Sequence, residues 1–258
     1  MPVITFMSDF GTEDHYVAAV KGKLLSKAPD QQIIDISHHI KPFDISHGAT
    51  VLAGVFRDFP QGTIHLVAVD SIRKSPKGIL MELEGHYFIG FDCGLLSMIS
   101  QQKPDFMTSL EVSNSTFPAR DIFPTIISRM IQGEAPATFG RKIDQMETLF
   151  ARQLKATKKE IVGNVVNVDY FGNLITNIPK QDFYKILELN GAGTNYVIRF
   201  GRESFESLHH YFTDVESGDC YVFFNSIGFL QIGINKGNAS QLLGLGIDAP
   251  VHVEFQTT

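Results

Sequence analysis

The first 140 residues alternate short apolar runs with segments whose apolar positions recur at helical spacing. Strands are expected at 3–7, 33–36, 64–69, 79–83, 87–90 and 110–112. Helices are expected at 16–27, 44–56, 94–100 and 120–131. Strands that alternate with helices in this way indicate an α/β domain with a largely parallel sheet.

The second half of the chain has a different pattern. Basic residues cluster between residues 141 and 160, which is typical of a solvated linker or a surface helix rather than of a binding patch. Short apolar runs punctuated by Gly and Asn follow at 161–168, 174–178, 195–200, 220–224, 230–234 and 251–255. These runs predict a smaller C-terminal β-rich domain, either a small barrel or a sandwich. We therefore expect two domains, 1–155 and 156–258.

Composition and charge exclude several classes of protein. A chain of 258 residues with 43% hydrophobic and 19% charged residues has the make-up of a soluble globular protein. The net charge of −6 and the lack of a basic run argue against a nucleic-acid partner. Cys93 and Cys220 suggest neither a zinc site nor a disulfide framework. No apolar stretch approaches the roughly 20 residues that cross a bilayer, and the N-terminus lacks a signal peptide. We expect a cytoplasmic protein without a metal or a cofactor.

A carboxylate follows the first predicted strand. Asp9 comes directly after the run 3–7, and Gly11 allows the backbone to turn without steric cost. Ligands of open α/β sheets bind beyond the carboxyl ends of the strands. Asp14 could act as a helix N-cap, whereas the pattern leaves Asp9 without a clear structural role. Two carboxylates with no cation between them suit hydroxyls and an ammonium group better than a phosphate.

Other polar and aromatic residues follow the next two strands. Asp70 ends the run 64–69 and precedes several cations, so it forms either a surface ion pair or a site that orients a nucleophilic water. His38 and His39 are adjacent and cannot both face one ion from a strand, so structural or capping roles are favoured over metal binding. Phe43 could belong to the core or form an aromatic wall; the pattern does not decide.

The segment Asp169-Tyr-Phe171-Gly-Asn173 separates two apolar runs of the C-terminal half. A tight turn explains the glycine and one amide, but leaves the carboxylate, the aromatic ring and the nearby Asn177 unexplained. Such a set could also recognise a small polar ligand, and the pattern alone leaves both alternatives open. Asn225-Ser226-Ile-Gly228 repeats the combination of amide, hydroxyl and glycine between two later runs.

The order and spacing of these segments resemble those of the S-adenosylmethionine hydroxide adenosyltransferase family, which also contains fluorinating and chlorinating halogenases. The resemblance rests on Ser8-Asp9-Phe10-Gly11 with Asp14, Asp35-Ile-Ser-His38, Gly90-Phe-Asp-Cys-Gly94, Thr116-Phe117 with Arg120-Asp121, 169–178, and Asn225-Ser226-Ile-Gly228. It implies an N-terminal α/β domain, a C-terminal β-rich domain and a homotrimer. It also implies that each site lies where one subunit's N-terminal domain meets its neighbour's C-terminal domain.

The resemblance assigns a role to individual residues. It implies that Asp9 binds the ribose diol and that Phe43 packs against the sugar and thioether. It implies that the methionine amino and carboxylate groups are held by Asp14, Asp169 and Ser226. It also implies that Phe171 and Phe212 sandwich the adenine and that Asn173 hydrogen-bonds the adenine edge. The hydroxyl and ammonium partners expected at Asp9 and Asp14 from their position agree with these roles.

The implied reaction is attack of hydroxide or a halide on the ribose C5′, which displaces methionine. Hydroxide-using members position the nucleophile with an Asp–Arg–His set. Asp70 matches the aspartate, while Arg73 or Lys77 would have to replace the arginine, and Pro118 stands where the histidine is expected. Ala119 replaces the serine of the halogenases. We expect hydrolysis of S-adenosylmethionine to adenosine and methionine. The alternatives are a sensor or sink that binds S-adenosylmethionine or adenosine with little or no turnover, and an unrelated sugar- or nucleoside-binding protein.

Overall fold

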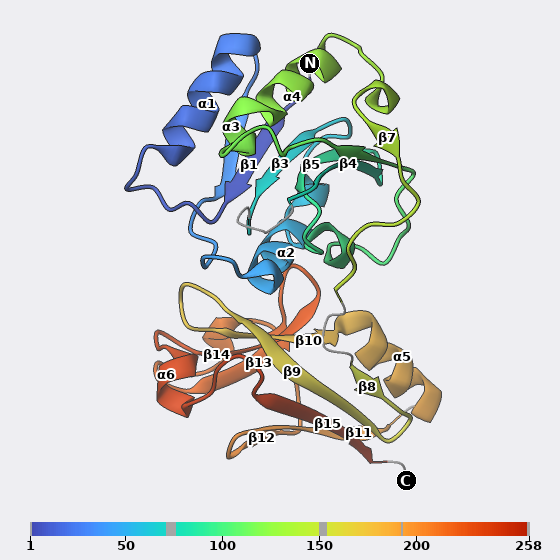
Figure 1. Cartoon of the computed structure of the whole chain (residues 1–258). Coiled ribbons are helices and arrows are strands. Elements are labelled where there is room, and N and C mark those ends of the chain that lie inside the picture. The colour runs from blue at the N-terminus through green and yellow to red at the C-terminus, as the bar shows by residue number, and fades with distance from the viewer. Residues whose placement is uncertain (1, 71–75, 150–153, 192, 257–258) are drawn as a thin grey trace. The chain divides into compact units, whose positions relative to one another are not determined.

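A computed structural model describes residues 2–70, 76–149, 154–191 and 193–256 of the chain (Figure 1). The chain divides into two compact units, Met1–Phe150 and Ala151–Thr258. The first has a mixed sheet with helices, and the second has a sheet of antiparallel strands. The predicted fold class, an α/β domain followed by a smaller β-rich domain, is confirmed.

The N-terminal unit contains a seven-stranded sheet with helices and single 3₁₀ turns (η) between its strands. Its elements are β1 (Ile4–Ser8), α1 (Tyr16–Lys27), β2 (Ile33–Ser37), α2 (Ile45–Ala53), η1 (Phe56–Asp58), β3 (Ile64–Ala68), β4 (Gly78–Leu83), β5 (His86–Phe91), η2 (Leu96–Met98), β6 (Phe106–Leu110), α3 (Pro118–Asp121), α4 (Phe123–Ile131), η3 (Pro136–Thr138) and β7 (Arg141–Lys142).

The strand order of this sheet places the loops after β1 and β3 side by side. The order is β2-β1-β3-β5-β4-β6-β7, and the pairs β1–β2, β1–β3 and β3–β5 are parallel. The chain leaves β1 towards β2 on one side and later returns to β3 on the other side. The carboxyl ends of β1 and β3 therefore flank a topological switch point, where open α/β sheets place their ligands.

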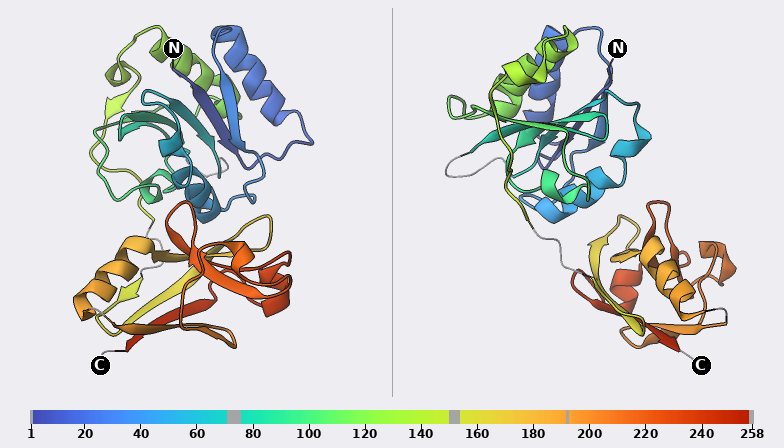
Figure 2. Two further views of the ribbon diagram at one scale, coloured as in Figure 1. Left: turned by 180° about the vertical axis from the view of Figure 1, so that it is seen from behind. Right: turned by 90° about the vertical axis from the view of Figure 1, so that its right-hand side faces the viewer.

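Helices cover both faces of the sheet because β1, β3 and β5 are almost wholly apolar and buried. The helical stripe of α1 buries Val17, Val20 and Leu24. Helices α1, α3 and α4 contact one another, whereas α2 contacts η1 and η2. Figure 2 shows these two groups on opposite faces of the sheet. The two-sided packing leaves the loops at the strand ends as the exposed, ligand-accessible part of the unit.

A polar network crosses the apolar core of this sheet. The Thr5 hydroxyl lies 2.7 Å from Nδ1 of His65, and Nε2 of His65 lies 3.2 Å from Nδ1 of His86. All three side chains are buried, and the rings of Phe56 and Phe88 pack against the histidines. Burial lowers the pKa of His65 to about 3, because the charged imidazolium would lose its hydration there.

The C-terminal unit consists of antiparallel strands and two helices. Its elements are β8 (Lys155–Ala156), β9 (Glu160–Val168), β10 (Leu174–Pro179), α5 (Lys180–Asn190), β11 (Asn195–Phe200), β12 (Glu203–Phe205), η4 (Phe212–Asp214), β13 (Cys220–Phe224), β14 (Phe229–Ile234), α6 (Ala239–Leu243) and β15 (Pro250–Gln256).

The sheet of this unit curls into a nearly closed barrel. Its strand order is β12-β11-β15-β9-β10-β14-β13, and β8 pairs with β9 off this path. Alternate residues of β9 and β15 point into a core that includes Ile161, Val165 and Val253. Of the two architectures expected from the sequence, a barrel or a sandwich, the barrel-like form is present.

Several elements differ from the sequence-based expectation, among them β6, η2 and α5. The strand expected at 110–112 is β6, which begins at Phe106 and pairs with Gly78–Glu82 of β4. The segment 94–100 forms only a 3₁₀ turn, and its apolar residues fill the core without the length of a regular helix. Helix α5 was not expected; Phe183 and Ile186 form its buried stripe.

Candidate functional site

A single carboxylate joins three loops at the carboxyl ends of the parallel strands. Oδ2 of Asp9, directly after β1, accepts the backbone N–H of Phe43 at 2.9 Å and that of Asp70 at 3.1 Å. Phe43 belongs to the loop after β2, and Asp70 to the loop after β3. The sequence left Asp9 without a structural role, and that expectation is wrong. The sequence pattern could not show this role, because both donors lie more than 30 residues away from Asp9 in the chain and only the tertiary structure brings them close.

The two donors have an unusual backbone conformation. Phe43 has a φ of 65° and Asp70 a φ of 52°, both in the left-handed region that residues with a side chain rarely occupy. Backbone strain of this kind costs on the order of 1–3 kcal/mol and persists where surrounding contacts hold it, often at functional sites. The Phe43 ring is 57% exposed, so it is not a core residue and is available as an aromatic wall.

Asp14 lies in the loop between β1 and α1, and it does not cap the helix. The N-cap position is occupied by His15, without a side-chain hydrogen bond, so the capping role weighed for Asp14 is wrong. Asp14 is exposed, and its carboxylate makes no hydrogen bond or ion pair with any described residue. Phe10, Tyr16 and Phe117 pack together beside this loop, with ring centroids 5.6–5.9 Å apart. This cluster ties the segment before α3 to the Asp9 loop.

The position of the expected family histidine is part of a short helix. Pro118 is the first residue of α3, and both Pro118 and Ala119 are buried. Arg120 turns outward and pairs with Asp121, with Nε 2.6 Å from Oδ1. That contact is the first cause of the lowered pKa of the Asp121 carboxyl. Neither Pro118 nor Ala119 carries a group that transfers protons, so neither side chain can replace the expected histidine.

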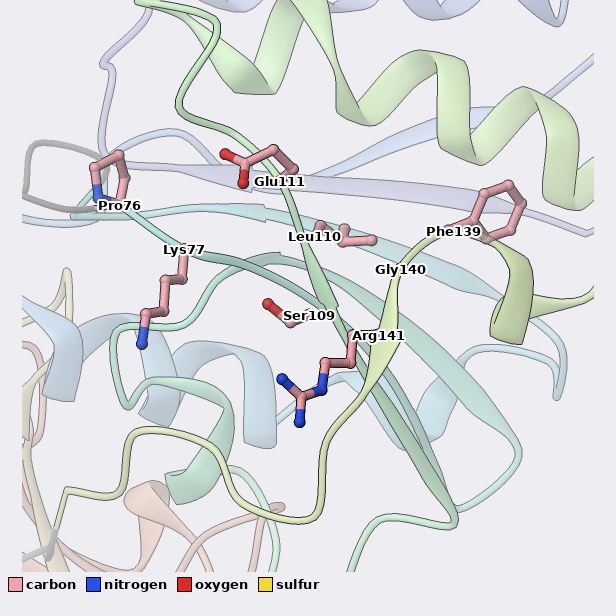
Figure 3. A pocket seen from close by; sticks show the side chains of 8 residues that line it. All are labelled: Pro76, Lys77, Ser109, Leu110, Glu111, Phe139, Gly140 and Arg141. Carbon is pink, nitrogen blue, oxygen red and sulfur yellow. The ribbon is translucent and has the colours of Figure 1, made fainter.

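Arg73 and Lys77 were the two cations considered as partners of Asp70. Arg73 lies outside the described residues. Lys77 points into a hollow of about 360 Å³, in which its ammonium group and the Arg141 guanidinium extend on the same side of the sheet (Figure 3). The hollow is lined by Pro76, Lys77, Ser109, Leu110, Glu111, Phe139, Gly140 and Arg141. Apart from Lys77, none of the candidate site residues lines it.

A buried histidine holds the loop that carries Asp9. The hydroxyl of Ser8 lies 2.8 Å from Nδ1 of His38, and the backbone N–H of Gly11 donates to the carbonyl of His38 at 2.8 Å. Nε2 of His38 is 3.1 Å from Asp35, which also pairs with Lys21. Burial lowers the pKa of His38, and it outweighs the opposite effect of the Asp35 carboxylate. The sequence-based expectation of a structural role for His38 agrees with these contacts.

The turn 169–173 is held by its own polar side chains. Asp169 Oδ1 accepts the backbone N–H groups of Phe171 and Asn173, both at 2.9 Å. The Asn173 carboxamide donates to Asp169 Oδ2 and accepts from the Tyr221 hydroxyl at 3.0 Å. Gly172 has a φ of 84°, which favours glycine. The hairpin therefore explains the carboxylate as well as the amide, more than the sequence pattern indicated.

What the hairpin leaves unexplained is its aromatic tip. The ring of Phe171 is 73% exposed and contacts only the neighbouring Tyr170 among the described aromatic rings. Phe212, the first residue of η4, is 56% exposed. The two phenylalanines make no ring contact with each other in the described structure. Large apolar groups exposed on the same small unit are available to stack on a planar ligand.

Ser226 lies at the other end of β10 from the turn 169–173. The carbonyl of Gly228 accepts the N–H of Lys180, just after β10, whereas the turn 169–173 precedes β10. At about 3.3 Å per residue, the six residues of β10 separate the two turns by roughly 20 Å. Ser226 is exposed, and Asn225 caps its turn. One chain therefore does not bring Ser226 next to Asp169, and their shared role stays a prediction.

Comparisons with known proteins cover both units. The model of the SAM hydroxide adenosyltransferase N-terminal domain matches residues 4–140, and that of the C-terminal domain matches residues 163–252. The chain belongs to the SAM hydroxide adenosyltransferase family. The (R)-S-adenosyl-L-methionine hydrolase of Methanocaldococcus jannaschii is 32% identical, with 95% of this chain and 93% of the relative covered.

Other relatives of the SAM hydroxide adenosyltransferase family extend the comparison. A fluorinase of an Actinoplanes species is 28% identical, with 91% of each chain covered. The crystal structure of an uncharacterized conserved protein from Thermotoga maritima superposes with a TM-score of 0.86 at 30% identity, covering 97% of this chain and 99% of that one. The architecture implied by the resemblance is thereby shown for the whole length of the chain.

The described residues also bear on metal and membrane binding. No group of three or more His, Cys, Asp or Glu side chains gathers in metal-binding geometry within the described ranges. No helix in the described part of the chain is long and apolar enough to cross a membrane.

Proposed function

We propose that this protein hydrolyses S-adenosylmethionine to adenosine and L-methionine. The observation that carries the proposal is the Asp9 carboxylate, which holds Phe43 and Asp70 in left-handed conformations at the switch point of the sheet. Relatives that cover almost the whole chain bear the name of S-adenosylmethionine hydrolase. We further propose that the protein acts in the cytoplasm as a homotrimer. Each site of this trimer would combine the N-terminal unit of one subunit with the C-terminal unit of the next.

The proposed chemistry needs a placed water molecule and little else. Oxygen of the water forms a bond to the ribose C5′, the C5′–S bond breaks, and its electron pair neutralises the sulfonium to give methionine. The water proton leaves to solvent or to a nearby base. Because the sulfonium is a good leaving group, alignment and exclusion of bulk water supply most of the acceleration. S-Adenosylmethionine is thus the substrate, and no further cofactor is required.

In this proposal each side chain has one role. The second oxygen of Asp9 binds the ribose diol, while Asp70 orients the water. Phe43 covers the sugar and thioether, and Asp14 binds the ammonium group of methionine. From the C-terminal unit, Asp169 holds the methionine head group, Phe171 and Phe212 stack on adenine, and the free N–H of the Asn173 amide reaches its edge. Arg73 is the proposed cation beside Asp70.

The test is incubation of purified protein with S-adenosylmethionine and chromatographic detection of adenosine and methionine. Asp70→Asn should lower the rate by about 10²–10⁴-fold, the usual contribution of a group that handles a proton. Asn tolerates the left-handed conformation of residue 70, so binding should persist. The exposed Asp30→Asn serves as the matched control and should keep full activity. Equal turnover in the Asp70→Asn variant would make Asp70 a structural residue.

A binding protein without turnover is the second candidate, and the burial of Pro118 and Ala119 favours it. Calorimetry with S-adenosylmethionine and with adenosine separates the two. Binding without product at high protein concentration would identify a sensor or sink. Asp9→Ala should weaken adenosine binding about 10–100-fold, because it removes a hydrogen bond to a charged group. If wild type binds neither ligand, both candidate functions are refuted.

A further inference from the structure

We propose that His38, acting through Ser8, is the positioning residue that fixes the Asp9 carboxylate of the site. The inference rests on the proposed function for the ligand it serves, a ribose diol. Its geometry rests on contacts within the N-terminal unit alone. His38 does not touch the place where substrate would bind, because its ring is buried beneath the loops.

His38 makes hydrogen-bond contacts with the Asp9 loop on both sides of Asp9. Ser8 precedes Asp9, and its hydroxyl lies 2.8 Å from Nδ1 of the ring. Gly11 follows, and its N–H donates to the His38 carbonyl at 2.8 Å. Ser8 and His38 are both buried, with exposures of 0% and 4%. Hydrogen bonds on both sides of Asp9 restrain its backbone and so fix the point from which its carboxylate reaches Phe43 and Asp70.

The orientation of the ring is set from the other side. Phe6 packs edge-on against the imidazole with centroids 4.7 Å apart. Nε2 lies 3.1 Å from Oδ1 of Asp35, without the alignment of a regular hydrogen bond. The Ser8 hydroxyl accepts the N–H of Phe10, so its own hydrogen is free to point at Nδ1. These contacts favour a neutral ring with its hydrogen on Nε2, facing Asp35.

The contacts resemble a Ser–His–Asp relay, but they cannot perform its chemistry. The Ser8 hydroxyl is fully buried, so it cannot reach a substrate as a nucleophile. What the chain of contacts reaches instead is Asp9, whose Oδ2 sets the backbone of Phe43 and Asp70. A shift of the Asp9 loop would therefore move the aromatic wall and the proposed water-orienting carboxylate together.

The experiment measures amide hydrogen exchange by mass spectrometry in wild type, Ser8→Ala and His38→Asn. Peptides that contain Phe43 and Asp70 report whether their N–H groups still donate to Asp9. Both variants should speed exchange there by about tenfold, the loss expected for one hydrogen bond. The matched controls are Ser26→Ala and His252→Asn, neither of which makes a hydrogen bond with the described residues of the Asp9 loop, and they should leave this exchange unchanged.

Two further measurements keep a positioning role distinct from a general structural one. Peptides of β5 provide an internal reference. Faster exchange there in the same proportion would mean that the variants merely loosen the core, and this would overturn the proposal, as would unchanged exchange around residues 43 and 70. In calorimetry, the preference for adenosine over 2′,3′-dideoxyadenosine should fall at least threefold in Ser8→Ala, because Asp9 no longer meets the diol.

The proposed function and this inference can fail separately. If wild type binds no nucleoside while the exchange pattern responds as expected, the proposed function is refuted and the positioning of Asp9 by His38 stands. If nucleosides bind and the preference for the diol is unchanged in Ser8→Ala, His38 does not position Asp9 for the ligand, and the inference is refuted while the proposed function stands.

Discussion

The buried pair His65 and His86 predicts an acid-sensitive N-terminal unit. Burial lowers the folded-state pKa of His65 to about 3, below its ordinary value of 6.5. Between these values the unfolded chain binds a proton that the folded chain does not. The free energy of unfolding therefore falls as the pH falls through this window. The stability is fully present above the unfolded value and is lost progressively below it.

The magnitude follows from the two pKa values. Going from about pH 7.5 to about pH 5, the unfolded state gains about 2 kcal/mol from protonation of this one histidine. The result hardly depends on the folded-state pKa, provided that it lies below about 4, because the folded protein then remains unprotonated throughout. The buried Thr5 hydroxyl and the His86 ring, which His65 contacts, hold it in this environment.

The assay is urea unfolding at these two pH values. Amide exchange in β3 and β5 peptides follows the transition, because it reports the N-terminal unit separately from the C-terminal one. His65→Gln should reduce the loss of stability on acidification by about 2 kcal/mol, since the titrating group is gone. Thr5→Val is the matched control: it should lower stability at both pH values and keep the pH dependence. A His65→Gln variant with the wild-type pH dependence would refute the burial argument.

Four further outcomes follow from single residues. Asn173→Ala removes one acceptor of the Tyr221 hydroxyl and should cost about 1 kcal/mol, the usual contribution of one hydrogen bond, measured by thermal unfolding. Gly22→Ala, in the exposed interior of α1 with open space around it, should stabilise by about 0.5–1 kcal/mol. Gly140→Ala should instead destabilise in the same assay, because its Cβ would lie 1.9 Å from a backbone oxygen of β6. Burial raises the pKa of Cys220 to about 12, so iodoacetamide at mildly alkaline pH should label it only after unfolding.

The sequence pattern predicted the elements that carry a complete apolar signal. Helix α1 was expected at 16–27 and occupies Tyr16–Lys27, because its buried stripe recurs at 3.6-residue spacing. The strand expected at 220–224 is β13. Where the apolar residues serve the core without a regular period, as at 94–100, the pattern overestimated the helix. Helix α5 was missed although Lys180-Gln-Asp182 separates its buried residues from β10.

The sequence pattern also selected some residues of the candidate site and missed others. Position at the end of a strand was enough to select Asp9 and Asp70, because parallel strands deliver their following residues to one edge of the sheet. Asp14 was selected as well, although its alternative role as a helix cap proved wrong once the helix began at Tyr16. Ser8 was not selected as a site residue, since a serine at a strand end carries no signal of its own. Its contact with His38 exists only because β1 and β2 are neighbours.

The sequence by itself determined the order of the α/β and β-rich parts and the strand ends at which polar residues gather, because these follow from local periodicity and from turn chemistry. The tertiary structure alone decided how those residues act on one another. Asp9 becomes the acceptor for Phe43 and Asp70, and Asp169 and Asn173 hold their own hairpin. Such hydrogen bonds join groups that no periodicity relates, and they form only when sheet order brings distant loops within about 3 Å.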